Sequence, residues 1–277
     1  MLCTAPMTVV LERPAERQRT ARRHDWLVSV VRRHPSTATL AGFCVLSFMI
    51  FSSTWVAPFT HIIGGPGGDQ IGSFWGMEWP VWAITHGQNP FFSTYLNAPT
   101  GFNVMWTYPP LPGLLMAPVT LSLGPVFSYN LLLTLGLAVS GWLMAIATRR
   151  LVPSWTAAIA AGLLFGFGPY QVSQSLNHVV LVLQFAAPLL LLLGHEALIR
   201  QRWRPWQVGG AAGLVIAAQI LTFIETAAIL FVVCALCLAG LWLVRDAGWR
   251  RRVAARHAAA SRRCRSDAAS RARSPPG

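Results

Sequence analysis

The distribution of charge constrains this chain more than any other feature. Between Ser36 and Thr148, the formally charged side chains are Asp69 and Glu78 alone. Over all 277 residues the charged fraction is 11%, whereas globular domains carry about 25%. Long uncharged apolar stretches are typical of segments that cross a bilayer. The pattern therefore predicts an integral membrane protein.

Six apolar segments are long enough, or nearly so, to cross a bilayer, which takes about 20 helical residues at 1.5 Å each. The third and fifth are short, and their ends can move by several residues. The expected fold class is all-α: a polytopic transmembrane helical bundle of about six spans, with a long outer loop containing juxtamembrane helices. The expected spans lie near residues 37–57, 126–148, 154–167, 178–199, 208–223 and 226–244.

Arginine placement predicts the orientation. If the N-terminus is inside, every arginine cluster beside these spans falls on the cytoplasmic side, as the positive-inside rule requires. We therefore expect a multi-pass protein of the cell membrane with both termini in the cytoplasm. The clusters are Arg13, Arg17, Arg19, Arg22, Arg23, Arg32 and Arg33 before the first span, Arg149 and Arg150 after the second, Arg200, Arg202 and Arg204 after the fourth, and Arg245 with Arg250, Arg251 and Arg252 after the sixth.

Three parts follow from this layout: a basic cytoplasmic arm (1–36), a transmembrane domain (37–249) and a tail rich in Arg, Ala and Ser (250–277) that we expect to be disordered. Within the transmembrane domain, an outer loop covers 59–110. The apolar stretch 111–123 is below spanning length, and counting it as a span would put Arg149 and Arg150 outside. We therefore assign it as a juxtamembrane or re-entrant element.

The net charge of +13 raises the question of nucleic acid. Because the arginines gather at the chain ends and between apolar runs, and because RNA-binding aromatic signatures and zinc-finger spacings are absent, we expect no nucleic-acid partner. Cys234 and Cys237 form a C-x-x-C inside an apolar run. Metal or redox chemistry would need an accessible polar setting, so we expect no metal site there.

In the outer loop, residues 70–85 have the periodicity of an amphipathic helix suited to the membrane interface. Glu78 is predicted to point into the apolar face of this helix. A carboxylate there must be paired, wetted or protonated; the alternative to a functional role is that it reaches headgroup water at the helix edge, helped by a kink at Pro80. The apolar face comprises Ile71, Phe74, Trp75 and Trp82, with Trp79 at its edge.

Three further polar residues of this loop have both a structural and a functional interpretation. Asp69 precedes the helical pattern and suits an N-cap, whose oxygen accepts a backbone N–H. His61 and His86 are candidate ligands or phosphate contacts, or else interfacial polar residues without metal-like spacing.

Several short motifs give the chain a family resemblance. The motifs are Gly68-Asp69, His86-Gly87-Gln88-Asn89-Pro90-Phe91-Phe92, Ala98-Pro99-Thr100-Gly101, Tyr108-Pro109-Pro110-Leu111, Gly124-Pro125-Val126-Phe127-Ser128-Tyr129-Asn130, Gly166-Phe167-Gly168-Pro169-Tyr170 and Asn177-His178. Their order along the chain resembles that of bacterial, especially actinobacterial, multi-pass glycosyltransferases of the GT-C superfamily, and the resemblance covers roughly residues 37–244.

The resemblance implies transfer of a sugar from a polyprenyl-phosphate carrier to an acceptor at the outer face of the membrane. It makes Asp69 the counterpart of a loop acid that serves as base, with Glu78 in support. The outer loop lacks Arg and Lys, so histidines, a divalent metal or residues absent from this chain would hold the donor phosphate. His178 and Glu225 are further candidates, Glu225 being equally well a wetted helix-end residue.

Two other functions stay open. Family members commonly run longer, so the tail after Trp249 is alternatively out-of-frame translation of GC-rich DNA, which would make the chain a truncated relative or a non-catalytic membrane protein. A transporter ranks third, because transporters carry ionisable groups or broken helices at the bilayer midplane in related halves, and no such repeat is present.

Overall fold

The computed structural model describes residues 33–64, 67–106, 108–244 and 248. Most of the basic arm (1–36) and the whole tail (250–277) therefore lie outside the described residues. The described chain is mostly helical. Its short strands β1 (Phe92–Ser93) and β2 (Phe102–Asn103) pair antiparallel, with Phe92 opposite Asn103.

The helices fall into those that form the main bundle and those that connect or flank them. The long or apolar helices are α2 (Pro35–Ile50), α7 (Pro125–Leu151), α8 (Trp155–Phe167), α11 (Ala186–His195), α12 (Pro205–Thr222) and α13 (Ile224–Val244). The others are α3 (Ser52–Trp55), α4 (Gly68–Thr85), η1 (Val104–Trp106), α5 (Pro110–Leu115), α6 (Ala117–Leu123), α9 (Pro169–Ser175), α10 (Val179–Val182) and the π-helix η2 (Glu196–Arg200).

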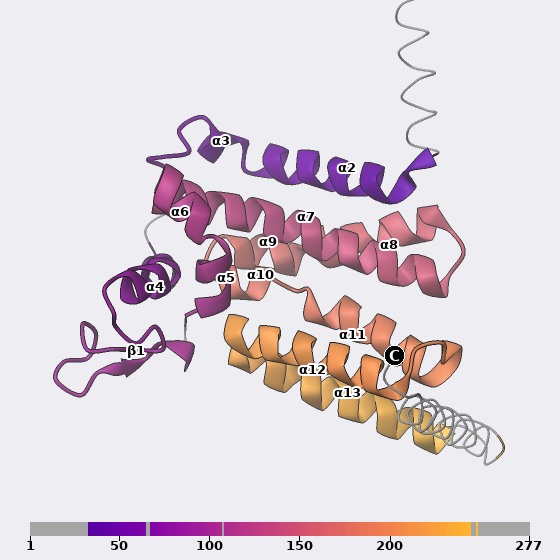
Figure 1. Ribbon diagram of the computed structural model, residues 1–277. Helices are drawn as coiled ribbons and strands as arrows, with labels where there is room; N and C mark the ends of the chain where they lie inside the picture. The colour runs from indigo at the N-terminus through magenta and orange to yellow at the C-terminus, as the bar shows by residue number, and fades with distance from the viewer. Residues whose placement is uncertain (1–32, 65–66, 107, 245–247, 249–277) are drawn as a thin grey trace, which may run out of the picture.

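The long helices lie side by side in one bundle, and the short elements α3 to α6 with β1 and β2 gather at one of its ends (Figure 1). Helix α7 packs against α2, α8 and α11. The α7–α8 contact is close because glycines meet there: a Cβ on Gly162 would lie 2.6 Å from the carbonyl oxygen of Gly141. Small residues at such crossings are typical of helices packed in lipid.

Three stretches of the described chain are long and apolar enough to cross a membrane: Pro125–Leu151, Val179–Arg200 and Ile224–Leu243. Helix α2 is apolar but has 16 residues, and α8 has 13. Each of the six segments predicted as spans coincides with a helix or a broken helix, but by length and composition three of them qualify rather than six. The segment 111–123 forms α5 and α6, two helices that meet at Met116.

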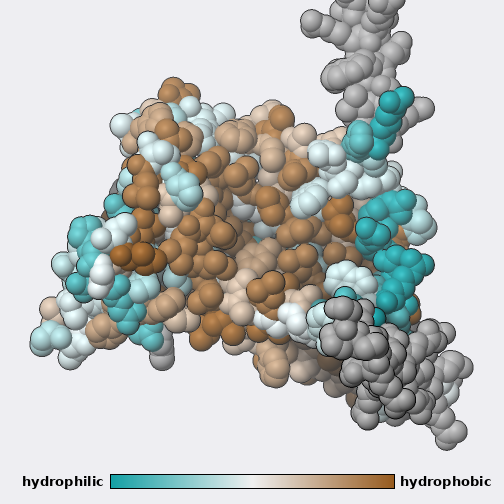
Figure 2. All heavy atoms as spheres, in the orientation of Figure 1, coloured by the Kyte–Doolittle hydropathy of each residue, from teal (hydrophilic) through white to brown (hydrophobic). Residues whose placement is uncertain are grey.

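The surface has an apolar band between two polar ends (Figure 2). One polar end carries α4 and β1; at the other, α7 connects to α8 and η2 connects to α12. Arg33 precedes α2, Arg149 and Arg150 end α7, and Arg200 ends η2. The described arginines therefore share the end opposite α4, which we call the arginine end.

The stretch Val179–Arg200 is broken between α10 and α11, and α7 takes up the backbone groups that the break frees. The Ser140 hydroxyl donates to the Val182 carbonyl at 3.0 Å and accepts from the Gln184 N–H at 3.1 Å. The Gln171 side chain also donates to the Val182 carbonyl, at 3.2 Å. Because hydrocarbon offers no water, such groups need protein partners.

Candidate functional site

Helix α4 carries the acids of the predicted site, and its first residues correct one expectation. The helix begins at Gly68 with Gly67 as N-cap, so Asp69 is the second helical residue rather than the cap. The Gln70 side chain accepts a hydrogen bond from the Gly67 N–H at 3.1 Å, which is half of a capping box. The Asp69 side chain lies outside the described part of the chain.

Gln70 is a residue that the sequence analysis missed, and it ties three segments together. Its buried amide donates to the carbonyls of Ile63, at 3.3 Å, and of Leu176. Leu176 precedes α10 by three residues, so this bond holds the start of α4 against the turn that carries His178. A single glutamine in this loop gives no pattern from which this role could have been read.

Further along α4, aromatic rings stack in a row on one side of the helix. The ring centroids of Trp75 and Trp79 are 5.2 Å apart with planes at 18°, and those of Trp79 and Trp82 are 5.3 Å apart at 28°. His86 continues the row, with its imidazole 4.3 Å from Trp82 at 15°. Positions 75, 79, 82 and 86 are spaced by three or four residues, which places their side chains on one helical face.

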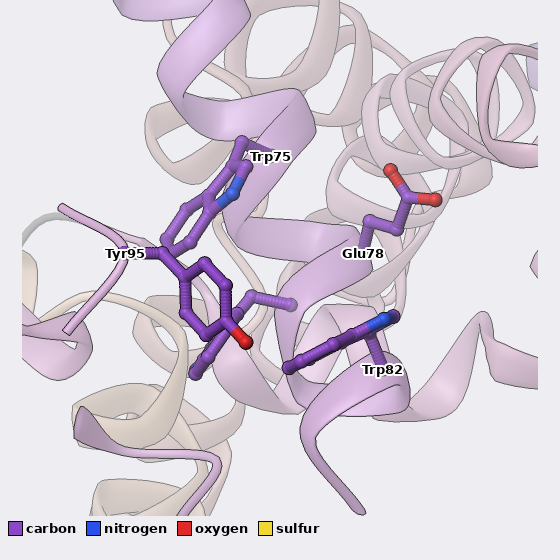
Figure 3. A pocket seen from close by; sticks show the side chains of 5 residues that line it. Trp75, Glu78, Trp82 and Tyr95 are labelled. Atoms are coloured by element: carbon purple, nitrogen blue, oxygen red, sulfur yellow. The ribbon is translucent and has the colours of Figure 1, made fainter. Parts of the chain in front are cut away.

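These rings form one wall of an open pocket of about 260 Å³, which we call the aromatic pocket; it is lined by Trp75, Glu78, Trp79, Trp82 and Tyr95. Tyr95 comes from the loop after β1 and meets the Trp82 ring edge-on at 5.3 Å. In Figure 3 the Tyr95 ring lies beside Trp82, whereas the Glu78 carboxylate points away from the rings. Among the described residues, the buried Trp79 indole nitrogen has no hydrogen-bond partner.

The predicted apolar face of α4 exists, but its surroundings differ from the expectation. Ile71 and Glu78 are both exposed, whereas the aromatic residues of the same face are half-buried against the protein. Farther around the helix, Gly76 lies against the Tyr108 ring so closely that a Cβ would overlap it. The Glu78 carboxylate is thus open to solvent and needs no buried partner.

The remaining predicted residues lie at the same end of the bundle. His61 is exposed, with Nδ1 3.3 Å from the Thr60 hydroxyl. His86 is exposed, and its Nδ1 lies 2.8 Å from the Trp82 carbonyl. His178 is the N-cap residue of α10, with Nδ1 2.8 Å from Gln174 Oε1. Glu225 is exposed in the first turn of α13.

Four of the predicted site positions fall into two separate groups in the structure. Position 69 and His178 share the corner that Gln70 holds, and Glu78 with His86 lies at the row of stacked rings. Nine residues of α4 separate positions 69 and 78, which corresponds to about 13 Å along the axis and about half a turn around it. Positions 69 and 78 therefore lie about two and a half turns apart on opposite sides of the helix.

Among the residues that the structure describes, no three His, Cys, Asp or Glu side chains gather as metal ligands would. Cys234 and Cys237 are free thiols on α13. What this end offers chemically is a set of aromatic faces, a solvent-accessible carboxylate and imidazoles.

Comparison with known proteins found no matching family model, no matching curated protein and no matching solved structure.

Proposed function

We propose that this chain is a membrane glycosyltransferase of the GT-C type, which moves a sugar from a polyprenyl-phosphate carrier to an acceptor hydroxyl. The observation that carries the proposal is the aromatic pocket, which lies next to an apolar helical bundle. Sugar rings have apolar C–H faces that stack on indole and phenol rings. Their hydroxyls donate to carboxylates, and Glu78 supplies one at the pocket wall.

In the proposed reaction the two acids have separate tasks. The acceptor oxygen attacks the anomeric carbon, its proton passes to Asp69, and the bond from that carbon to the phosphate oxygen breaks, so that polyprenyl phosphate leaves and the configuration inverts. Glu78 lies at the pocket wall with its carboxylate directed away from the rings, so it binds hydroxyls of the part of a sugar that extends beyond them. His61, His86, His178 and Glu225 border the substrates, and a divalent metal is the further candidate for holding the donor phosphate.

The proposal includes a membrane layout. The six helical segments cross the bilayer, the end with α4 faces outward, and the arginine end faces the cytoplasm. Its support is that the arginines at the ends of α7 and η2 lie together across the apolar band from α4. Arginine favours the inner surface.

The test is sugar transfer by the full chain in proteoliposomes that contain radiolabelled polyprenyl-phosphate sugars. We expect Asp69→Asn to lower kcat by roughly 10²–10⁴-fold, the usual contribution of a general base. Trp82→Ala should raise the KM for the acceptor more than it lowers kcat. The matched control is Trp206→Ala, an exposed tryptophan at the arginine end, which should leave both constants unchanged.

Each outcome bears on a different part of the proposal. Undiminished transfer by the Asp69 variant would remove Asp69 as base. Equal effects of Trp82→Ala and Trp206→Ala would remove the aromatic pocket from substrate binding. If the folded wild-type chain transfers no sugar from any polyprenyl-phosphate donor, the non-catalytic alternative replaces the enzyme.

A further inference from the structure

A second cavity, of about 610 Å³, opens at the arginine end, and we call it the arginine pocket. Its volume falls within the roughly 300–1,000 Å³ of small-molecule sites. Charged residues at helix ends and aliphatic residues farther along the helices line it together. The charged lining comprises Arg149, Arg150, Arg200 and Glu196, and the aliphatic lining includes Leu189, Leu192 and Leu193.

The carboxylate that lines this pocket, that of Glu196, is already hydrogen-bonded to the loop after η2. One oxygen of the buried Glu196 carboxylate accepts hydrogen bonds from the backbone N–H groups of Arg202, at 2.6 Å, and Trp203, at 2.8 Å. The other oxygen lies 3.9 Å from Arg200 Nε. Glu196 therefore acts as the anchor of the turn between η2 and α12.

The two arginines of α7 keep an unneutralised charge. Within the described segments, neither Arg149 nor Arg150 has a carboxylate at salt-bridge distance. The Arg149 guanidinium lies 5.6 Å from the ring centroid of Trp155, which holds it in place without cancelling its charge. The helix C-terminus favours cations there, but it leaves the donor hydrogens of the guanidinium groups available to an anion.

The aliphatic lining indicates that a ligand of this pocket also has an apolar part. Leu189 lies six residues before the last residue of α11, and Val215 lies ten residues into α12, so apolar wall extends about 9–15 Å from the helix ends. A small hydrated anion would leave this wall uncovered. A hydrocarbon chain would cover it and gain the free energy of burial.

We propose that the arginine pocket binds one phosphate-headed membrane lipid, with the phosphate between Arg149, Arg150 and Arg200 and the tail along the leucines of α11. Basic pockets between membrane helices bind anionic headgroups in this way, and guanidinium forks match phosphate oxygens. The site lies at the opposite end of the bundle from the aromatic pocket, and it does not rest on the proposed sugar transfer.

Lipid binding to the purified full chain in detergent tests this, measured by native mass spectrometry with dioctanoyl phosphatidylglycerol. We expect a one-to-one complex that Arg149→Gln with Arg150→Gln weakens roughly 10- to 30-fold. The control, Arg33→Gln with Arg202→Gln, removes the same charge from exposed arginines outside the pocket and should stay within about twofold.

Two further binding measurements identify the ligand. Dioctanoyl phosphatidylcholine should bind at least about tenfold more weakly, because its net charge is zero, and millimolar inorganic phosphate should not displace the lipid. Leu192→Trp fills the apolar part of the pocket without changing its charge, so it should also weaken lipid binding. This variant tests the pocket if the double arginine variant does not fold.

Equal losses in the pocket and control variants would show general surface attraction and overturn the site. Equal binding of the zwitterionic lipid would overturn recognition of the phosphate charge. Complete displacement by inorganic phosphate would make it an anion site with no place for a tail, which overturns the lipid assignment.

Discussion

The buried side chain of Asn130 accepts a hydrogen bond from the backbone N–H of Ile63 at 3.0 Å. Its amide nitrogen donates to the carbonyls of Pro58, at 3.0 Å, and His61, at 2.7 Å. A single side chain on α7 thus pairs with three backbone groups of the segment between α3 and α4. It fixes the chain that leads into the candidate site.

Replacing this side chain should be costly. We expect Asn130→Ala to lower the free energy of unfolding by about 2–4 kcal/mol, since it removes three hydrogen bonds to the backbone and leaves the buried Ile63 N–H without its partner. Thermal or denaturant unfolding in detergent measures the change. The control is Asn103→Ala, which removes one bond, to the Met105 N–H, from an exposed residue and should cost under about 1 kcal/mol. Similar losses for both variants would contradict the anchoring role.

Two glycine substitutions should have opposite effects. Gly162→Ala places a methyl group against the Gly141 carbonyl and the Phe43 ring, so we expect a loss of about 1–3 kcal/mol from overpacking. Gly209→Ala in α12 meets no atom within 4 Å, and it should leave stability unchanged or raise it by up to about 1 kcal/mol through helix propensity. Comparison of the two melting temperatures checks the α7–α8 contact; a harmless Gly162→Ala would refute it.

The hydroxyl of Tyr129 should be dispensable for stability. This residue of α7 is fully buried in the core, and within the described part of the chain its hydroxyl has no hydrogen-bond partner. Tyr129→Phe removes an unpaired polar group and should be neutral or stabilising. Tyr129→Ala should cost about 3–5 kcal/mol, because the ring packs edge-on at 6.2 Å from Phe74. A marked loss in Tyr129→Phe would reveal a partner for the hydroxyl.

Cysteine labelling measures the proposed membrane layout directly. In a background without the five native cysteines, Glu78→Cys and Arg202→Cys introduce thiols at exposed positions of opposite ends. We expect a membrane-impermeant reagent to label position 78 from outside intact cells and position 202 only after the membrane is opened. Labelling of both positions from one side would rule out a bundle that crosses the bilayer as proposed.

Much of the helical framework could be predicted from the sequence, because the length of an apolar segment can be counted along the chain. The segment 126–148 corresponds to α7 at Pro125–Leu151, and 208–223 to α12 at Pro205–Thr222. The length of the short third segment was also close. Segment 154–167 forms the 13 residues of α8, since Pro153 precedes it and Gly168 and Pro169 follow it.

The candidate site was harder to predict, because it depends on which side of α4 packs against the other elements. The periodicity placed Ile71 and Trp82 on one face, but it could not show that Gly72 and Gly76 admit the Tyr108 ring on another. The roles of Gln70 and Asn130 depend on partners 106 and up to 72 residues away in the sequence. No local pattern records such contacts.

The Ser140 bonds to Val182 and Gln184 have a mechanical consequence. The peptide groups on both sides of the break are fastened to α7, so one hydroxyl holds both the end of α10 and the segment that leads into α11. The corner where α10 meets α4 is thereby anchored to α7, independently of the contacts that α11 makes.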